Sequence, residues 1–317
     1  MKKYRHLIIT FFISLICFLV SPLIYNQPFV KNNIYVNDND NKLPEQIISD
    51  NILLKPEDDN LRIMTLNLLV HYSSWGGTSV NERKDIFFDL VNGYAPDVIG
   101  LQEMCNDWYG EIKRNVNSYE FASPLTTAFP QKMTAILYNK NSVELIDSGS
   151  IAFSNSVNFK SRRVAWALFK SKTTGEVFCV VNTHLSYLTE AKKEENFFTQ
   201  TRQVNELYSI TEKLYSQYNS PVIIIGDFNT KKRGSYDKSV ILAGSYGILN
   251  SLYTDAEDIA QNKYNGENLG YKNTLNDHIF IKGYIKIKNL SILSQEAFSS
   301  LSDHYPLMAD IILKNNP

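Results

Sequence analysis

The sequence predicts an α/β protein in which one large domain follows an N-terminal extension. Short runs rich in Val, Ile and Leu alternate with segments of helical spacing over residues 61–314, and no second linker interrupts them. Such alternation is typical of the α/β class. Hydrophobic residues make up 44% of the 317-residue chain, which is enough for a sizeable core and excludes wholesale disorder.

The first half of this domain is predicted to alternate between strand and helix. The apolar run at 61–69 is typical of a strand, and residues 82–92 have the amphipathic spacing of a helix. Pro96 breaks that helical pattern and precedes a second predicted strand at 97–102. Further strand-like runs lie at 133–139, 164–171 and 177–182.

The second half begins with a long segment of helical spacing at 194–218. Residues 222–225, V-I-I-I, form an uninterrupted β-branched run, which is typical of a strand buried on both faces. An irregular stretch with a predicted helix near Ser239 follows. The last predicted strands are residues 277–281 and 307–313.

The N-terminal extension is expected to direct the domain out of the cytoplasm. A basic start, M-K-K-Y-R-H, precedes an apolar run at 7–24, whose length lies between a signal-peptide core and a minimal membrane span. No convincing cleavage site follows, which favours a signal-anchor within residues 1–25 over a cleaved signal peptide. Residues 26–60, rich in Asn, Asp and Lys, are predicted to be a flexible linker. We therefore expect a single-pass protein of the cell membrane with an exported C-terminal domain, or alternatively a secreted protein.

Charge and cysteine content narrow the function classes. The 32 basic and 33 acidic residues give a net charge of −1, without the basic footprint of a tight nucleic-acid binder. A hydrolase that binds nucleic acid transiently is still compatible with this charge. The three cysteines, Cys17, Cys105 and Cys179, lack the spacing of a disulfide framework or a zinc site. We expect Cys105 and Cys179 to be buried thiols.

Polar residues recur at the ends of the predicted strands. Each alone has a structural explanation, such as a turn, a cap or a satisfied core histidine. Their recurrence at successive strand ends indicates a single site, because rigid strand ends position polar groups accurately. The residues concerned are Asn67, Glu103, His184, Asp227, Asn229, Asp303 and His304.

These residues belong to six motifs that follow one another along the chain. The motifs read T-L-N at 65–67, L-Q-E-M at 101–104, N-T-H-L at 182–185, G-D-F-N at 226–229, N-D-H-I-F at 276–280 and S-D-H-Y-P at 302–306. In this order they resemble the endonuclease/exonuclease/phosphatase superfamily of DNase I-like hydrolases. The resemblance covers residues 61–313. It implies a four-layered α/β sandwich of two mixed sheets packed face to face, with outer helices and a site at one edge of the sheets.

The same resemblance implies a metal-dependent phosphoesterase that uses Mg²⁺, with Mn²⁺ as a substitute. Glu103 matches the main metal ligand, a hard carboxylate suited to a hard ion. Asn67 resembles the amide that completes or supports the metal site. Asp303 matches an acidic residue beside the metal and is the expected second ligand.

The remaining motif residues match the groups that act on the phosphoester. Asp227 would orient or deprotonate the attacking water, and Asn229 would hydrogen-bond the phosphate. His184 would donate to a phosphoryl oxygen as negative charge builds in the transition state. His304 resembles the catalytic imidazole, and the resemblance gives it Asp277 as the carboxylate partner that raises its pKa and fixes its tautomer.

Several neighbouring residues carry competing interpretations. His278 stands where the family more often has an aromatic residue, and we interpret it as a structural strand residue beside the site. Arg162 and Arg163 precede a strand that begins with a substrate-facing arginine in some relatives, but a solvated strand end is the favoured interpretation. The loop at 71–80 is a candidate substrate lip, in which His71 is expected at the surface.

The predicted reaction is hydrolysis of a phosphodiester by an in-line activated water. The substrate is open between nucleic acid and phospholipid, as for a nuclease or a sphingomyelinase-like diesterase. The inositol-polyphosphate branch is disfavoured because the chain reads G-D-F-N-T. Membrane contact is expected through the N-terminal segment, and no protein partner is inferred. The competing class, a catalytically inactive surface binding module, should have lost one of Glu103, His184, Asp227 or His304, and all four are present.

Overall fold

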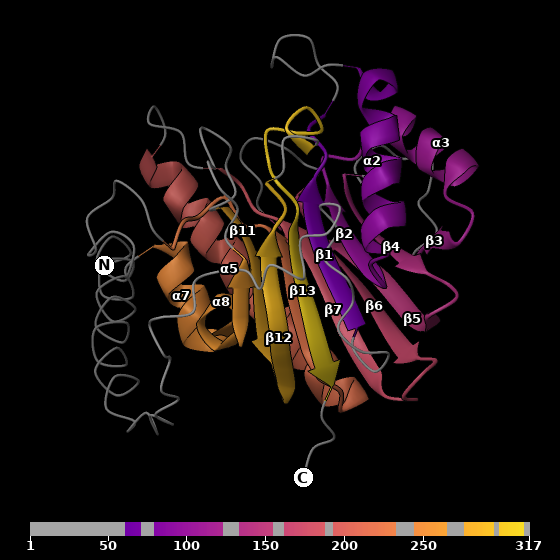
Figure 1. Ribbon diagram of the computed structural model, residues 1–317. Helices are drawn as coiled ribbons and strands as arrows, with labels where there is room; N and C mark the ends of the chain where they lie inside the picture. Colours follow the sequence, from indigo (N-terminus) through magenta and orange to yellow (C-terminus); the bar gives the residue numbers. More distant parts are fainter. Residues whose placement is uncertain are drawn as a thin grey trace, which may run out of the picture. The chain divides into compact units, whose positions relative to one another are not determined.

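Two β-sheets form the framework of the domain in a computed structural model, which describes residues 61–70, 79–122, 133–154, 162–187, 193–232, 244–264, 276–294 and 298–313. The strands of the first sheet are β1 (Leu61–Asn67), β2 (Val98–Gln102), β3 (Tyr119–Phe121), β4 (Thr134–Asn139), β10 (Asn262–Tyr264), β12 (Ile285–Ile292) and β13 (Leu307–Leu313). Within the described residues their order is β10-β12-β13-β1-β2-β4-β3 (Figure 1).

The second sheet is built from later segments of the chain. Its strands are β5 (Val143–Ala152), β6 (Arg163–Ser171), β7 (Val177–His184), β8 (Val222–Asp227), β9 (Thr254–Asp255) and β11 (Asp277–Lys282). They lie in the order β5-β6-β7-β8-β11-β9 among the described residues. Both sheets mix parallel and antiparallel pairs, since β1 runs parallel to β2 and β7 runs parallel to β8.

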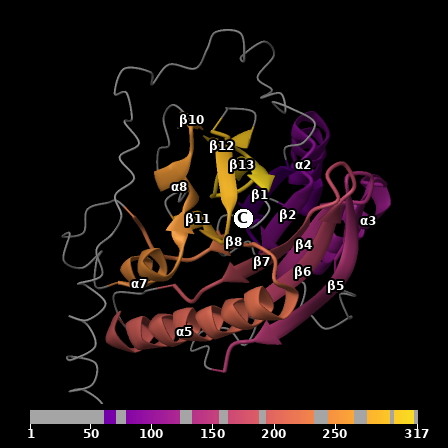
Figure 2. The ribbon, with the colours of Figure 1, turned by 90° about the horizontal axis from the view of Figure 1, so that it is seen from below.

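Helices cover the outer face of each sheet. They are α2 (Val80–Tyr94), α3 (Asn106–Asn115), α5 (Lys193–Tyr218) and α7 (Ser245–Leu252). The short helix α8 (Ala256–Ile259) instead contacts β11 and β12, one strand of each sheet, and adds Ala256 to the core between the sheets. Helices α2 and α3 pack through Phe87 and Trp108 in one cluster with Met64 of the first sheet. Helices α5 and α7 pack in another cluster, in which Leu207 joins Ile224 of the second sheet. Figure 2 shows α5 running along the second sheet.

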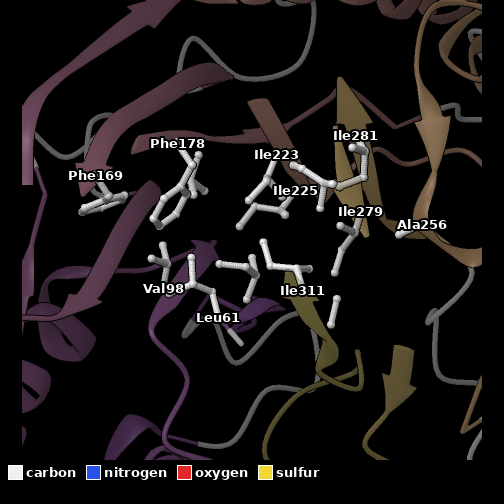
Figure 3. Packing of buried hydrophobic residues seen from close by; sticks show 14 of the residues in the cluster. Leu61, Val98, Phe169, Phe178, Ile223, Ile225, Ala256, Ile279, Ile281 and Ile311 are labelled. Atoms are coloured by element: carbon white, nitrogen blue, oxygen red, sulfur yellow. The ribbon is translucent and has the colours of Figure 1, made fainter. Parts of the chain in front are cut away.

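The inner faces of the two sheets meet in a core of buried apolar side chains. Phe169, Phe178 and Ile225 of the second sheet face Val98 and Ile311 of the first sheet within one cluster (Figure 3). Successive residues of a strand point to opposite faces, so each of these strands contributes to the inner core and to an outer, helix-covered core. The four-layered α/β sandwich expected from the sequence is therefore confirmed.

Strand direction brings the polar strand ends to one edge of the sandwich. Asn67 pairs with Gln102 at the carboxyl ends of β1 and β2. His184 pairs with Asp227 at the carboxyl ends of β7 and β8. Strand β11 runs antiparallel to β8, so its first residue, Asp277, also pairs with Asp227. Strand β13 likewise runs antiparallel to β1 and begins at this edge.

All eight predicted strands, and the helices predicted at 82–92 and 194–218, are present with shifts of a few residues. Two long strands, β5 and β12, were not predicted from the sequence, nor was helix α3. Cys105 and Cys179 are buried free thiols, as expected. Among the described residues no helix combines the length and the apolarity that a membrane crossing requires. The apolar run at 7–24, the linker at 26–60, most of the loop at 71–80 and the helix predicted near Ser239 lie outside the described residues.

Candidate functional site

The amide of Asn67 connects the two sheets at their shared edge. Its Nδ2 donates to Asp227 Oδ2 at 3.0 Å and approaches Glu103 Oε1 at 3.3 Å. Its Oδ1 accepts the backbone N–H of Leu69 at 3.0 Å. The hydroxyl of Ser302 donates to the Asn67 carbonyl at 2.6 Å. One residue of β1 thus contacts three of the other motifs.

Glu103 follows β2 in a left-handed backbone conformation, with φ of 56°. Its Oε2 accepts the backbone N–H of Val70 at 3.0 Å, and its Oε1 accepts the Asn67 amide. A carboxylate offers about four lone-pair sites, so two are left after these bonds. The side chain is half-buried, which leaves access from solvent. A half-buried carboxylate with free lone pairs fits a hard divalent cation, and the Asn67 amide holds it in place through Nδ2.

Asp227 lies at the centre of the cluster. Its Oδ2 is 3.2 Å from Nε2 of His184 and 3.8 Å from Nε2 of His304. Its Oδ1 accepts the backbone N–H of Asn229 at 2.9 Å. Burial opposes its ionisation, but the two facing imidazoles outweigh burial and hold the pKa of the Asp227 carboxyl far below its usual value. Asp227 is therefore a carboxylate that accepts protons and hydrogen bonds.

His304 and Asp277 form a buried pair. Nδ1 of His304 lies 2.6 Å from Oδ2 of Asp277. Burial raises the pKa of the Asp277 carboxyl to about 7, against the opposing pull of His304. Burial lowers the pKa of His304, but Asp277 and Asp227 overcome it and raise that pKa to about 10. Between these values His304 is an imidazolium with Asp277 as its counterion, and its Nε2–H faces Asp227.

His184 differs from His304 in charge. Burial lowers its pKa, and the neighbouring Arg162 lowers it further, although Asp227 acts in the opposite direction. His184 is thus neutral at pH 7. Its Nε2 faces a carboxylate at 3.2 Å, so Nε2 carries the proton.

For Arg162 the interpretation from the sequence was wrong. It is only 6% exposed, so the interpretation as a solvated strand end is incorrect for this residue. Burial lowers the pKa of Arg162, and the charges of Asp227 and Glu103 counteract that shift. The guanidinium therefore adds a buried positive charge within electrostatic reach of both acids. Arg163, which follows it, is half-buried and donates to Ser150 Oγ at 2.9 Å.

The loop after β8 is held by α5 and by its own side chains. Asn229 has a left-handed backbone, with φ of 49°, and its Nδ2 donates to the carbonyl of Leu185 at 2.9 Å. Gln200 of α5 is fully buried, and its Nε2 lies 2.8 Å from the carbonyl of Ser186 and 3.1 Å from those of Phe228 and Asn229. The loops after β7 and β8 are thereby joined behind the site. The second N–H of the Asn229 amide is the one that could serve a phosphate.

Gly226 is required by the close approach of β7 and β8. Its φ is 148°, and a Cβ at this position would lie 2.1 Å from the carbonyl oxygen of Thr183. No side chain fits there without moving the backbone. The glycine of the G-D-F-N motif thus allows Asp227 to lie directly beside His184.

Two further motif residues, missed in the sequence, connect the sheets just below the site. Asn182 Nδ2 donates to the carbonyls of Leu101 and Ala135 across the interface at 3.0 and 2.7 Å. Its Oδ1 accepts from Gln102 Nε2 at 2.6 Å. Both residues occur inside the quoted motifs: Gln102 directly precedes Glu103, and Asn182 lies two positions before His184. This closeness to predicted site residues was the only signal for them in the sequence.

Asp303 and His278 lie at the margins of the cluster. Asp303 is exposed, and Ser302 Oγ donates to its Oδ1 at 3.3 Å. His278 is buried, with its Nε2 2.9 Å from the carbonyl of Thr230 and its ring centroid 5.1 Å from that of Tyr246. These contacts are those of a packed structural residue. His71 lies outside the described residues.

Among the described residues, the ligand atoms of Asp227, Asp277 and His304 all lie within 4.8 Å of one another. These three side chains could hold a metal ion. The same atoms include the His304–Asp277 hydrogen bond, which an ion at that position would have to replace. Glu103, the carboxylate that the sequence favoured as main metal ligand, is joined to this group through Asn67.

The chain is similar to known proteins. Residues 64–304 match the family model described as Endonuclease/Exonuclease/phosphatase family. Tyrosyl-DNA phosphodiesterase 2 of Bos taurus is 24% identical over 242 residues, which are 69% of this chain and 60% of that protein. The chain thus spans less than two thirds of the length of this curated relative.

Solved structures show the same fold. A mannosyl-6-phosphatase of Bacteroides thetaiotaomicron is similar with a TM-score of 0.64 and 19% identity, covering 80% of this chain and 100% of that one. The human nocturnin catalytic domain with bound sulfate gives a TM-score of 0.60 and 19% identity, covering 81% and 95%.

Proposed function

The chain belongs to the endonuclease/exonuclease/phosphatase family, and from this premise we propose that it is a Mg²⁺-dependent phosphodiesterase. One observation carries the proposal. A single ionised carboxylate, Asp227, lies between a neutral imidazole and an imidazolium that has its own carboxylate partner. This combination of acceptor and donors is what in-line attack of water on a phosphoester requires.

In the proposed reaction Asp227 orients the attacking water and accepts its proton. Its low pKa makes it a weak base, so orientation is its larger contribution. Asn67 and the backbone of Asn229 hold the carboxylate in place by hydrogen bonds at 3.0 and 2.9 Å. A water that bridges the 3.8 Å gap between Asp227 and His304 would be aligned by both.

The histidines and Arg162 act on the phosphoryl oxygens as negative charge accumulates there. His304 donates through Nε2–H as an imidazolium. His184 is neutral, and its Nε2–H faces Asp227 at 3.2 Å, so it would donate to a phosphoryl oxygen in exchange for that contact. Preorganised donors in a buried site stabilise the transition state strongly, because they need no reorganisation during the reaction. Arg162 adds a cation that does not lose its charge in the accessible pH range.

We place the metal at Glu103, with Asn67 in support and Asp303 as second ligand. When bound there, Mg²⁺ would neutralise phosphate oxygens and support the leaving group. Two ligands of one Mg²⁺ lie about 3 Å apart, given metal–oxygen distances of about 2.1 Å. The 2.6 Å between His304 Nδ1 and Asp277 Oδ2 is shorter, and suits a shared proton better than a shared ion.

The substrate class favoured is a phosphodiester of nucleic acid or phospholipid. The bovine relative is named a phosphodiesterase, which supports the diester, whereas a structural neighbour is named a phosphatase. The deciding assay uses the domain 61–314 with a panel of plasmid DNA, RNA, sphingomyelin, phosphoinositides and mannose 6-phosphate. Exclusive turnover of the monoester would refute the diesterase assignment.

Catalysis itself is tested with bis-p-nitrophenyl phosphate. We expect turnover that requires Mg²⁺ or Mn²⁺, stops with EDTA and is lost in the His304→Ala variant. A folded wild-type protein without metal-dependent turnover on any panel substrate would instead support the inactive binding module. Asp310→Asn serves as the matched control, because Asp310 is a buried acid paired with Arg62 away from the site.

We also propose that residues 1–25 anchor the protein in the cell membrane and export the domain. The basic start and the apolar run at 7–24 support this proposal. In cells that express the full chain, the domain should be found in the membrane fraction. Protease added to the intact cells should degrade it, because an exported domain is accessible from outside. A protein whose mature N-terminus lies beyond residue 21 would indicate a cleaved signal peptide.

A further inference from the structure

Arg83 of helix α2 is a buried arginine that none of the sequence motifs contains. It is 1% exposed. Its Nη1 donates to the carbonyls of Leu68 and Leu301 at 2.5 and 2.9 Å, and its Nη2 donates to the carbonyl of Leu69 at 2.9 Å. The guanidinium carbon lies 5.3 Å from the ring centroid of Trp108. One side chain therefore binds two segments that are far apart in sequence.

The first of these segments is the turn directly after Asn67. Leu69 has a left-handed backbone, with φ of 53°, which is uncommon for a residue other than glycine. Its N–H donates to Asn67 Oδ1 at 3.0 Å, and the next N–H, that of Val70, donates to Glu103 Oε2 at 3.0 Å. The turn thus orients Asn67 and Glu103, two of the three residues of the proposed metal site, through its backbone.

The second segment is the loop before β13. Leu301, which accepts a hydrogen bond from Arg83, directly precedes Ser302 and Asp303. Ser302 Oγ donates back to the carbonyl of Asn67 at 2.6 Å. The two segments are therefore joined at two points, by Arg83 from α2 and by Ser302 at the site.

We infer that Arg83 is a positioning residue for the metal site, which sets the mutual placement of Asn67, Glu103 and Asp303 through these carbonyl contacts. The inference rests on the proposed function. A planar guanidinium directs several N–H groups in fixed directions, and the single ammonium of lysine cannot reproduce this fork. Groups that hydrogen-bond metal ligands directly commonly change metal affinity by about 10- to 100-fold when they are removed. Arg83 acts through the backbone next to the ligands, so we expect the lower end of that range.

The charge of Arg83 acts against a cation at the same place. Burial lowers the pKa of Arg83, and the carboxylates of Asp303 and Glu103 are among the groups that raise it again. A positive charge within reach of both acids disfavours Mg²⁺ between them. Geometry and charge therefore predict opposite signs for the effect of removing Arg83 on Mg²⁺ affinity.

The test is Mg²⁺ binding to the metal-free full-length protein by titration calorimetry, with Arg83→Met and Arg83→Lys. We expect both variants to bind Mg²⁺ about tenfold more weakly or worse. Tighter binding by Arg83→Met, with Arg83→Lys like wild type, would show that only charge matters and overturn the inference. A lower Tm with unchanged Mg²⁺ affinity would also overturn it, since Arg83 would then be a scaffold residue alone.

Arg62→Met is the matched control. Arg62 is likewise 1% exposed, but it begins β1 at the opposite end from the site and pairs with Asp310 at 2.7 Å. Its loss should lower the Tm and leave Mg²⁺ affinity unchanged. If the Arg83 variants do not fold, Ser302→Ala removes the other connection between the two segments. Unchanged Mg²⁺ affinity in Ser302→Ala would then overturn the inference, whereas a wild-type protein that binds no Mg²⁺ would contradict the proposed metal site instead.

Discussion

Replacing Asp277 by asparagine tests the proposed charge state of His304 most directly. The substitution keeps the size of the side chain and removes the negative charge 2.6 Å from His304 Nδ1. Asp277 is the strongest of the groups that raise the pKa of His304 to about 10. Without it burial lowers this pKa, with only the more distant Asp227 and Asp303 acting against burial. We therefore expect His304 to lose its proton at a lower pH.

The size of the effect follows from the lost interaction. A hydrogen bond to a charged group contributes about 1.5–3 kcal/mol. Each 1.36 kcal/mol in the activation barrier changes the rate about tenfold. If the transition state requires His304 as a cation, complete loss of this interaction would lower kcat by up to roughly 150-fold. The fall is smaller where the asparagine Oδ1 still accepts from Nδ1–H.

The assay is hydrolysis of bis-p-nitrophenyl phosphate between pH 6 and 9.5 at saturating Mg²⁺. For the wild type, kcat/KM should rise as Asp277 ionises near pH 7 and stay high, because His304 keeps its proton up to about pH 10. The Asp277→Asn variant should lose the rise near pH 7 and decline within the range. A variant with wild-type kcat and an unchanged profile would refute the reasoning. Asp310→Asn should lower the Tm without altering the profile.

Three further predictions concern the framework of the site. Gly100→Ala should destabilise the domain by about 1–3 kcal/mol in urea unfolding, because its Cβ would lie 2.7 Å from a side chain of the facing sheet. The control Gly110→Ala, on α3, should be neutral or stabilising by up to about 1 kcal/mol. Gln200→Leu should cost about 1–3 kcal/mol and lower kcat, since three loop carbonyls lose their donor. Arg162→Met should raise the pKa of His184 in an NMR titration, because a neighbouring cation is removed. An unchanged pKa of His184 would show that the charge of Arg162 does not act on the site.

The sequence was most informative where local pattern and burial agree. The V-I-I-I run before Gly226 predicted a strand buried on both faces, and all residues of β8 are buried. Strand ends then located the site, because a strand terminus and the polar residue after it are both local signals. The same logic missed β5, an edge strand that has β6 as its described neighbour and whose residues are mostly partly or fully exposed.

Other residues could not be placed because their environment is created by distant segments. Strand β12 starts with the alternation I-K-I-K, but a register shift between Ile287 and Asn289 interrupts the pattern. Gln200 looks like part of the polar face of α5, yet it is buried against the loops after β7 and β8. Arg162 carried the same ambiguity, since only the surrounding fold determines whether a strand-end arginine is solvated.

The distribution of charge along the edge of the sandwich supports separate positions for the metal and for the phosphoryl group. Asp227 and Asp277 lie close to the imidazolium of His304, and the guanidinium of Arg162 acts on Asp227, so positive charge compensates the acids there. Glu103 accepts only hydrogen bonds from neutral amide groups in its described contacts. The charges of Arg83 and Arg162 also act on Glu103, but Glu103 has no ion pair among its described contacts. The anionic phosphoryl group is stabilised most near His304 and Arg162, and Glu103 is the acid whose charge is least compensated by direct contact. Asn67 bonds to Asp227 and approaches Glu103, and thereby fixes the separation between the two positions. The short Asp277–His304 contact therefore suits a shared proton, and this supports our proposal that the metal binds on the Glu103 side of Asn67.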